Sequence, residues 1–105
     1  MRRERFFYPT FPIWVSPRKL FTEYIYRGFA KPILYPVLGP DGIEMTRNFP
    51  MKDNVAGEAA DHPHHKSLWF AHGDINGVDF WGEDKHSGRI VHDQRLETRE
   101  SAECV

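Results

Sequence analysis

The groups most capable of chemistry are concentrated in one short part of the chain. Residues 61–81 hold four of the six histidines, three aspartates and two of the three tryptophans of the 105-residue sequence. Imidazole and carboxylate groups can coordinate a metal ion or transfer a proton, and an indole ring can stack on the apolar face of a sugar. If the sequence reports a function, we expect to find it in this segment.

The first histidines of the segment flank a proline. Pro63 disfavours helical backbone at His62 and favours an extended conformation there. Side chains two residues apart in an extended chain share a side, so His62 and His64 are expected to point together while His65 points the opposite way. Two imidazoles on one side of a rigid loop could hold a metal ion or grip a polyhydroxylated ligand.

The dipeptide Asn76-Gly77 lies between apolar residues and predicts a tight β-hairpin, because a type I′ turn requires positive φ at both central positions. Such a turn would pair residue 75 with 78, 74 with 79, and 72 with 81. One face of this hairpin is predicted to be core and consists of Trp69, Ala71, Ile75, Val78 and Phe80. The other face would carry His72, Asp74, Asp79 and Trp81.

Asp74 and Asp79 would lie opposite one another in this register. Opposed carboxylates repel each other unless a metal ion, a protonated His72 or a shared proton neutralises them. Three interpretations stay open: a carbohydrate or small polar ligand site, a metal site, and side chains that only hydrogen-bond local backbone, as Asp and Asn commonly do in turns. No histidine spacing here matches a diagnostic metal motif, so no metal ligand is assigned and no cofactor is expected.

Composition narrows the classes of function. Fourteen basic and fifteen acidic side chains give a formal net charge of −1, so the chain lacks the excess of positive charge that is typical of nucleic-acid-binding proteins. The single cysteine, Cys104, excludes an internal disulfide and a cysteine-type zinc site. The basic N-terminus, residues 1–7, lacks the apolar stretch of an export signal, and no apolar run reaches the roughly 18 residues that span a bilayer. We therefore expect a soluble, cytoplasmic protein without nucleic-acid or membrane partners.

Short apolar runs separated by glycine and proline predict strands and turns. Residues 20–26 predict one strand, and residues 33–38 a second in which Pro36 requires a sheet edge or a bulge. Residues 39–42 predict a turn into a third strand at 43–46, so that residues 33–46 would form a hairpin. Residues 48–60 are expected to be the loop that leads to the histidines, and Trp14 is expected to pack in the core.

Three stretches resemble the PmoA-like family of bacterial proteins, many of which carry the label methane oxygenase. The stretches are residues 35–42, 61–70 and 72–81. The family is itself distantly similar to the galactose-mutarotase-like proteins. The resemblance implies a β-supersandwich with a carbohydrate groove, and isomerase-, epimerase- or lyase-like acid–base chemistry. Methane oxidation is not expected, because the oxygenase subunit of that name is an integral membrane protein.

The resemblance also suggests roles for individual residues. The candidate catalytic groups are His64, His72 and Asp74. The candidate ligand-binding residues are His62, His65, Asn76, Asp79 and Trp81.

Members of the PmoA-like family are typically much longer than this chain. We therefore expect one incomplete β domain, a partial antiparallel β-sandwich with long loops, in which residues 1–19 are an extension, 20–93 the β core and 94–105 a charged tail. A different class of function follows as an alternative. The chain would then be a non-catalytic module that pairs its open sheet edges with another chain, including a second copy of itself.

Overall fold

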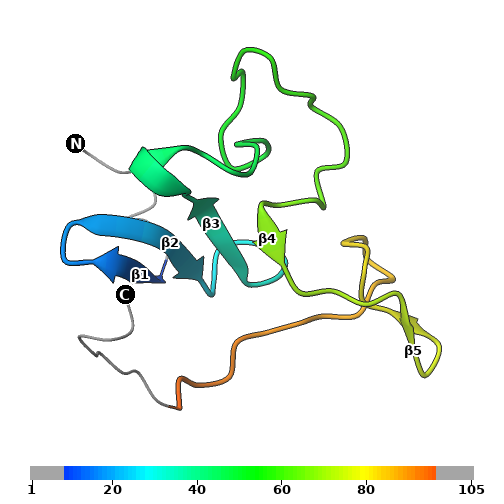
Figure 1. Cartoon of the computed structure of the whole chain (residues 1–105). Helices are drawn as coiled ribbons and strands as arrows, with labels where there is room; N and C mark the ends of the chain where they lie inside the picture. Colours follow the sequence, from blue (N-terminus) through cyan, green and yellow to red (C-terminus); the bar gives the residue numbers. More distant parts are fainter. Residues whose placement is uncertain (1–8, 97–105) are drawn as a thin grey trace.

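The computed structural model describes residues 9–96, which fold into two antiparallel sheets (Figure 1). Four strands pair in the order β1-β2-β3-β4, and β5 pairs with β6 in a separate hairpin. The strands are β1 (Thr10–Ser16), β2 (Lys19–Ile25), β3 (Ile33–Val37), β4 (Leu68–Trp69), β5 (Asp74–Ile75) and β6 (Val78–Asp79). Among the described residues the only helical element is a single 3₁₀ turn, η2 (Pro40–Gly42). The expected all-β, antiparallel fold with long loops is confirmed.

Some expectations concern parts of the chain outside residues 9–96. The N-terminal segment 1–7, Cys104 and the tail beyond residue 96 lie outside the described residues. Within residues 9–96, no helix is both long enough and apolar enough to cross a membrane.

Strand β1 corrects the expectation that residues 1–19 are an extension outside the β core. It pairs antiparallel with β2 from Thr10 to Ser16. The prolines of this segment argue against a strand in sequence, but Pro12 lies on an edge strand. The Tyr26 N–H donates to the Pro9 carbonyl, so in an antiparallel pair every second residue counted from Pro9 hydrogen-bonds to β2. Pro12 falls between these positions, with its backbone nitrogen facing away from β2. Its missing N–H therefore removes no hydrogen bond from the sheet.

Strands β2 and β3 match the strands predicted at residues 20–26 and 33–38. Thr22 pairs with Val37 and Tyr24 with Leu34, so β3 has one residue more than β2 between these pairs. The extra residue falls at the Tyr35–Pro36 step, which confirms the bulge that Pro36 was expected to require.

The third strand, predicted at residues 43–46, does not form. The chain turns through η2 and returns beside β3, but it makes only one isolated bridge, between Leu38 and Glu44. Ile43 and Met45 are exposed on this segment, at 59% and 62%. With so little side-chain burial to stabilise it, the predicted hairpin over residues 33–46 shrinks to a turn and a single bridge.

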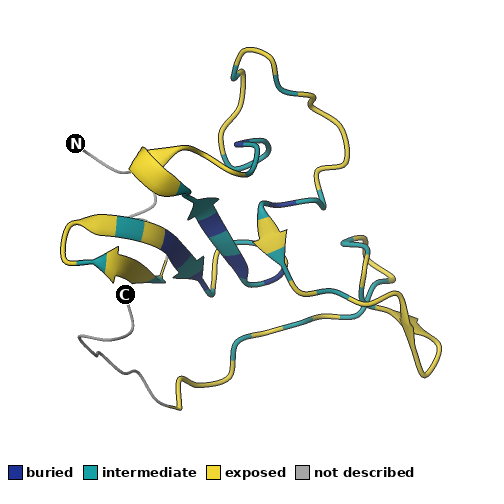
Figure 2. Cartoon of the chain, in the orientation of Figure 1, coloured by how far each residue is buried: buried dark blue, intermediate teal, exposed yellow. Residues whose placement is uncertain are grey.

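The main sheet has two distinct faces, which we call the core face and the open face. Ile25, Ile33 and Trp69 lie in one row across β2, β3 and β4 on the core face. The buried core consists of Ile25, Ile33 and Tyr35, with Phe29, Met51 and Trp69 packed against it. Figure 2 shows the longest buried stretches on β2 and β3, with smaller ones in the loops.

The predicted loop at residues 48–60 lacks strands, and its base is held by one carboxylate. Glu58 accepts hydrogen bonds from the backbone N–H groups of Asn48 and Phe49 and from the Asn48 side-chain amide. These donors, the Asn48 backbone N–H first, hold the pKa of Glu58 below its usual range. Asn48 in turn accepts a 2.7 Å hydrogen bond from the buried Tyr35 hydroxyl, which ties the loop to β3.

The segment after the β5–β6 hairpin returns to the main sheet at residues 92–95. The His92 ring lies 4.6 Å from the Tyr26 ring, and its Nδ1 is 3.1 Å from the Tyr24 hydroxyl. Burial at this contact raises the pKa of Tyr24. Trp14 lies elsewhere on β1 and is 50% exposed, so the expectation that it packs in the core was wrong. It sits on an edge strand at a position that no other described segment covers.

Candidate functional site

Residues 61–66 form a turn that gathers three histidine rings. The His65 N–H donates to the His62 carbonyl at 2.9 Å, and His62 has a positive φ of 49°. The ring centroids of His62, His64 and His65 lie 4.3 to 5.8 Å apart. The expectation that His65 points away from His62 and His64 was wrong, because the backbone turns here and is not extended.

Arg47 holds this turn in place. Its guanidinium donates to the carbonyls of Ala59, Asp61 and His62 and to the Asp61 carboxylate, with Nη1 2.9 Å from Asp61 Oδ1. The hydrogen bond from Arg47 is the main cause that holds the pKa of Asp61 below its usual range, and the hydrogen bond from the His62 side chain is the second. A planar fork with several fixed donors suits this task, and a lysine ammonium could not satisfy all these acceptors at once.

Two tryptophans complete what we call the His–Trp cluster, which consists of His62, His64, His65, Trp69 and Trp81. His65 stacks on Trp69 at a centroid distance of 5.3 Å and meets Trp81 edge-on at 5.8 Å. The two indoles lie 5.9 Å apart at 62°. Trp69 packs against the core, whereas Trp81 is 44% exposed. The cluster is therefore anchored on the core face of the sheet and open to solvent at Trp81.

The surroundings of His65 favour its neutral form. Partial burial is the main cause that lowers the pKa of His65, and repulsion from His64, His62 and Arg47 adds to it. His65 is therefore neutral at pH 7, with one ring nitrogen as donor and the other as acceptor. His62 differs in having a carboxylate neighbour, since its Nδ1 lies 3.0 Å from Asp61 Oδ2.

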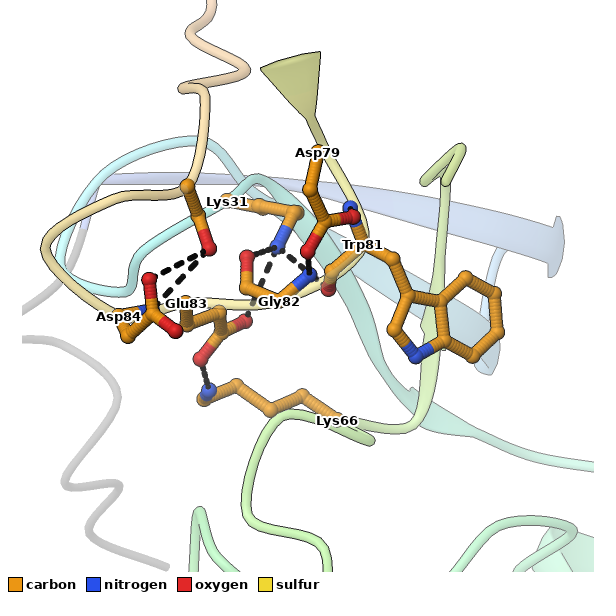
Figure 3. Close-up of polar contacts among 8 residues, drawn as sticks. Lys31, Lys66, Asp79, Trp81, Gly82, Glu83 and Asp84 are labelled. Atoms are coloured by element: carbon orange, nitrogen blue, oxygen red, sulfur yellow. Dashed lines mark hydrogen bonds and ion pairs between the residues drawn. The ribbon is translucent and has the colours of Figure 1, made fainter. Parts of the chain in front are cut away.

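A second group of charged residues positions the Trp81 backbone (Figure 3). We call it the lysine–glutamate network, and it consists of Lys31, Lys66 and Glu83. The ammonium of Lys31, 3% exposed, donates to the carbonyls of Trp81 and Gly82 at 3.1 and 2.9 Å. Glu83 pairs with Lys31 at 3.5 Å and also with Lys66. Residues 81–83 are thereby fixed to the segment between β2 and β3.

The β5–β6 hairpin follows the predicted turn but does not build the predicted site. Asn76 and Gly77 have φ of 55° and 84°, and Asp74 pairs with Asp79 as expected. The ladder stops there, because the Phe80 N–H donates to the carbonyls of both His72 and Gly73. This bulge prevents the expected pairing of His72 with Trp81.

The carboxylates of the two hairpin aspartates accept hydrogen bonds from nearby backbone N–H groups. Asp74 Oδ1 accepts the Gly77 N–H at 2.7 Å, and Asp79 accepts the N–H groups of Trp81 and Gly82 at 2.8 and 3.2 Å. These donors stabilise the two carboxylates without a metal ion or a protonated histidine. His72 is exposed, and among the described residues its side chain makes no hydrogen bond or ring contact. The expected face of His72, Asp74 and Asp79 is therefore not assembled, and Asn76 only forms the turn.

Trp69 packs against the core as predicted, but the predicted core face was wrong at Ile75 and Val78. Ile75 and Val78 are 44% and 40% exposed, because the hairpin projects away from the main sheet (Figure 1). Of the predicted site residues, the structure brings His62, His64, His65 and Trp81 together and leaves the hairpin residues apart. Within residues 9–96, no group of three or more histidine, cysteine, aspartate or glutamate side chains is arranged to hold a metal ion.

Sequence reasoning missed the residues that position the cluster, which are Arg47, Asp61, Lys31, Lys66 and Glu83. Asp61 could have been found from the sequence, since it directly precedes His62. The others carry no local signal, because their partners lie 12 to 52 residues away in the chain.

Fold and site together define an all-β protein with a partly open cluster of imidazole and indole rings on one face of its sheet. Residues 16–104 match the model of a protein family described as a family of unknown function (DUF6807), and the chain belongs to this family. Neither the curated proteins nor the solved structures contain a match to this chain.

Proposed function

We propose that the His–Trp cluster binds a carbohydrate or another small polar ligand, with Trp81 as the stacking surface. The observation that carries the proposal is the convergence of three imidazoles on two indoles, one of which is 44% exposed. An exposed indole offers the apolar face of a sugar ring a flat contact. The neutral His65 ring beside it can donate to and accept from sugar hydroxyls.

Preorganisation supports binding. Arg47 fixes the backbone that carries the histidines, and the lysine–glutamate network fixes the backbone of Trp81. The Trp69 Nε1–H is closed to solvent and has no acceptor within residues 9–96, so Trp69 serves as an inner wall and Trp81 as the exposed contact. A site with rigid walls loses little conformational entropy when a ligand binds.

The choice of a carbohydrate rests on the resemblance of residues 35–42, 61–70 and 72–81 to PmoA-like proteins, which we keep as part of the proposal. Binding is favoured over the acid–base catalysis expected from His64, His72 and Asp74, because only His64 lies in the cluster. One contact favours catalysis as a second function. The pairing of Asp61 with His62 Nδ1 would orient His62 as a general base for isomerase- or lyase-like chemistry.

The binding proposal is tested by calorimetric titration and tryptophan fluorescence with a panel of mono- and oligosaccharides, including uronic acids. We expect heat and a change in fluorescence from the wild-type chain, and at least a tenfold loss of affinity in Trp81→Ala. Trp14→Ala is the matched control, because Trp14 is equally exposed but lies on β1. Absence of binding across the panel, or equal losses in both variants, would refute the proposal.

A further inference from the structure

Three rings of the His–Trp cluster form a continuous stack, and the other two flank it. The His65 ring is parallel to His62 within 15° and to Trp69 within 24°, at centroid distances of 4.9 and 5.3 Å. His64 and Trp81 meet His65 edge-on, at 67° and 86°. His64 lies 6.5 Å from Trp81 and 5.8 Å from His62. A pair of imidazoles therefore adjoins the exposed indole, at a distance that one sugar residue can span.

The negative charge beside these imidazoles is already matched by other groups. Asp61 contacts His62 Nδ1 through Oδ2 at 3.0 Å, and its Oδ1 accepts from Arg47 at 2.9 Å. The permanently charged guanidinium thus balances this carboxylate. Asp79 accepts from backbone N–H groups, and Glu83 pairs with two lysines. Among the described residues, no second carboxylate is paired with a histidine of the cluster.

Positive charge on the imidazoles would therefore lack a partner within residues 9–96. Partial burial first, and then repulsion from His64 and His62, lowers the pKa of His65, so this ring stays neutral. The His62 side chain is 57% exposed and His64 is half-buried, so these two rings can exchange protons with water. A ligand anion would supply the missing counter-charge, so that the anion and a proton on these rings stabilise each other.

His62 is oriented for this role. Its Nδ1 faces Asp61, which leaves the opposite ring nitrogen, Nε2, for a ligand. In an imidazolium both ring nitrogens are donors, and a hydrogen bond from a charged donor to an anion is roughly twice as strong as one between neutral groups. Arg47 holds the backbone of this turn, so the donor needs little reordering when a ligand binds.

A carboxylate suits the pair better than a phosphate ester. One carboxylate carries a single negative charge, which one imidazolium balances. A phosphate ester carries about −1.5 to −2 charges at pH 7 and would require both imidazoles to be protonated. Two protonated rings would repel each other, since the ring centroids of His62 and His64 are only 5.8 Å apart and Arg47 lies beside them.

We propose that the ligand of the His–Trp cluster is a sugar acid whose ring stacks on Trp81 and whose carboxylate binds His62 and His64. Binding takes up a proton at these imidazoles, so the affinity rises as the pH falls through the range in which histidine titrates. This inference rests on the proposed function of the cluster and adds the charge class of the ligand.

The experiment compares sugars that differ in charge, by calorimetric titration of the full chain. The probes are glucose, glucuronate and glucose 6-phosphate, with galactose and galacturonate as a second pair. We expect a uronate to bind about tenfold more tightly than its neutral parent at about pH 5.5, and this preference to shrink by about pH 7.5 as imidazole loses its proton. The uronate carboxylate stays ionised over this range, so its own titration does not contribute. Titration in two buffers of different ionisation enthalpy counts the protons taken up.

His62→Gln and His64→Gln keep a hydrogen-bonding side chain but cannot carry the charge. We expect each to reduce the ratio of uronate to neutral-sugar affinity and to flatten its pH dependence. His72→Gln is the matched control, because His72 is exposed and lies outside the cluster, and it should keep the wild-type ratio. Circular dichroism reports whether each variant retains its strands, and the comparison of sugars on the wild-type chain requires no variant.

The possible results separate this inference from the proposed function. Equal affinities for uronates and their neutral parents, or a preference without proton uptake, would overturn the inference and leave sugar binding in place. Tighter binding of glucose 6-phosphate than of glucuronate would overturn the assignment of a carboxylate. Absence of binding by every sugar would overturn the proposed function together with the inference.

Discussion

At the scale of single residues, the candidate site depends on side chains that bind backbone. Arg47 and Lys31 each donate to carbonyls of distant segments, and these contacts decide where the imidazole and indole rings lie. The histidines and Trp81 could be identified as candidates from the sequence, because histidine and tryptophan are rare residue types and are concentrated in residues 61–81. The sequence could not show that Asp74 and Asp79 would be used by local N–H groups, since that use depends on the conformation of the hairpin ends.

Arg47→Lys should lower the free energy of unfolding by roughly 1–3 kcal/mol, the usual cost of losing hydrogen bonds to a charged group. The ammonium cannot reproduce the fork that binds Ala59, Asp61 and His62 together. Urea unfolding followed by tryptophan fluorescence measures the change. Arg89→Lys is the control, because Arg89 is exposed, and equal stabilities for both variants would contradict the role assigned to Arg47.

The lowered pKa of His65 predicts a pH dependence of stability. The unfolded chain takes up a proton at His65 below about pH 6.5, while the folded chain resists protonation because the ring is partly buried beside His64 and His62. The contribution of His65 to stability is therefore complete above pH 6.5 and decreases as the pH falls from there toward the folded pKa. Thermal unfolding at a series of pH values should give a flatter profile for His65→Gln than for wild type. The exposed His72→Gln should keep the wild-type slope, and parallel profiles for wild type and His65→Gln would contradict the assignment.

At the scale of elements, local chemistry in the sequence was enough where an element is defined by its own residues. Short apolar runs predicted β2 and β3, and Asn76-Gly77 predicted the β5–β6 turn. Strand β1 was missed because proline is acceptable only on an edge, and edge position is a property of the assembled sheet. The prediction of a buried face on the hairpin was wrong because local sequence does not show how a hairpin is oriented relative to a distant sheet.

Glu83→Gln should be severely destabilising, by about 3–5 kcal/mol, because it leaves two poorly exposed ammonium groups without a counter-charge. The Lys31 and Lys66 side chains are 2% and 11% exposed. The variant should also weaken ligand binding at Trp81, because residues 81–83 lose their attachment. Chemical denaturation measures the first effect, with Asp93→Asn as an exposed control for the change of charge. A loss below 1 kcal/mol would show that the network does not hold this segment.

At the scale of the whole molecule, the described part of the chain is a four-stranded sheet with the His–Trp cluster on its core face and a separate two-stranded hairpin. Its radius of gyration is 15.2 Å, against about 13 Å for a compact domain of this length. The fully buried hydrophobic core consists of three residues among those described.

The central claim, that the His–Trp cluster is a ligand site, is tested most directly by following its own resonances. In a ¹H–¹⁵N spectrum the three indole N–H groups, of Trp14, Trp69 and Trp81, give separate signals that single Trp→Phe variants assign. Titration with the saccharide that gives the largest calorimetric heat should shift the Trp81 and Trp69 signals together with the histidine ring signals, and leave Trp14 in place. Shifts confined to Trp14 or the β5–β6 hairpin, or no shift at saturating saccharide, would contradict the account.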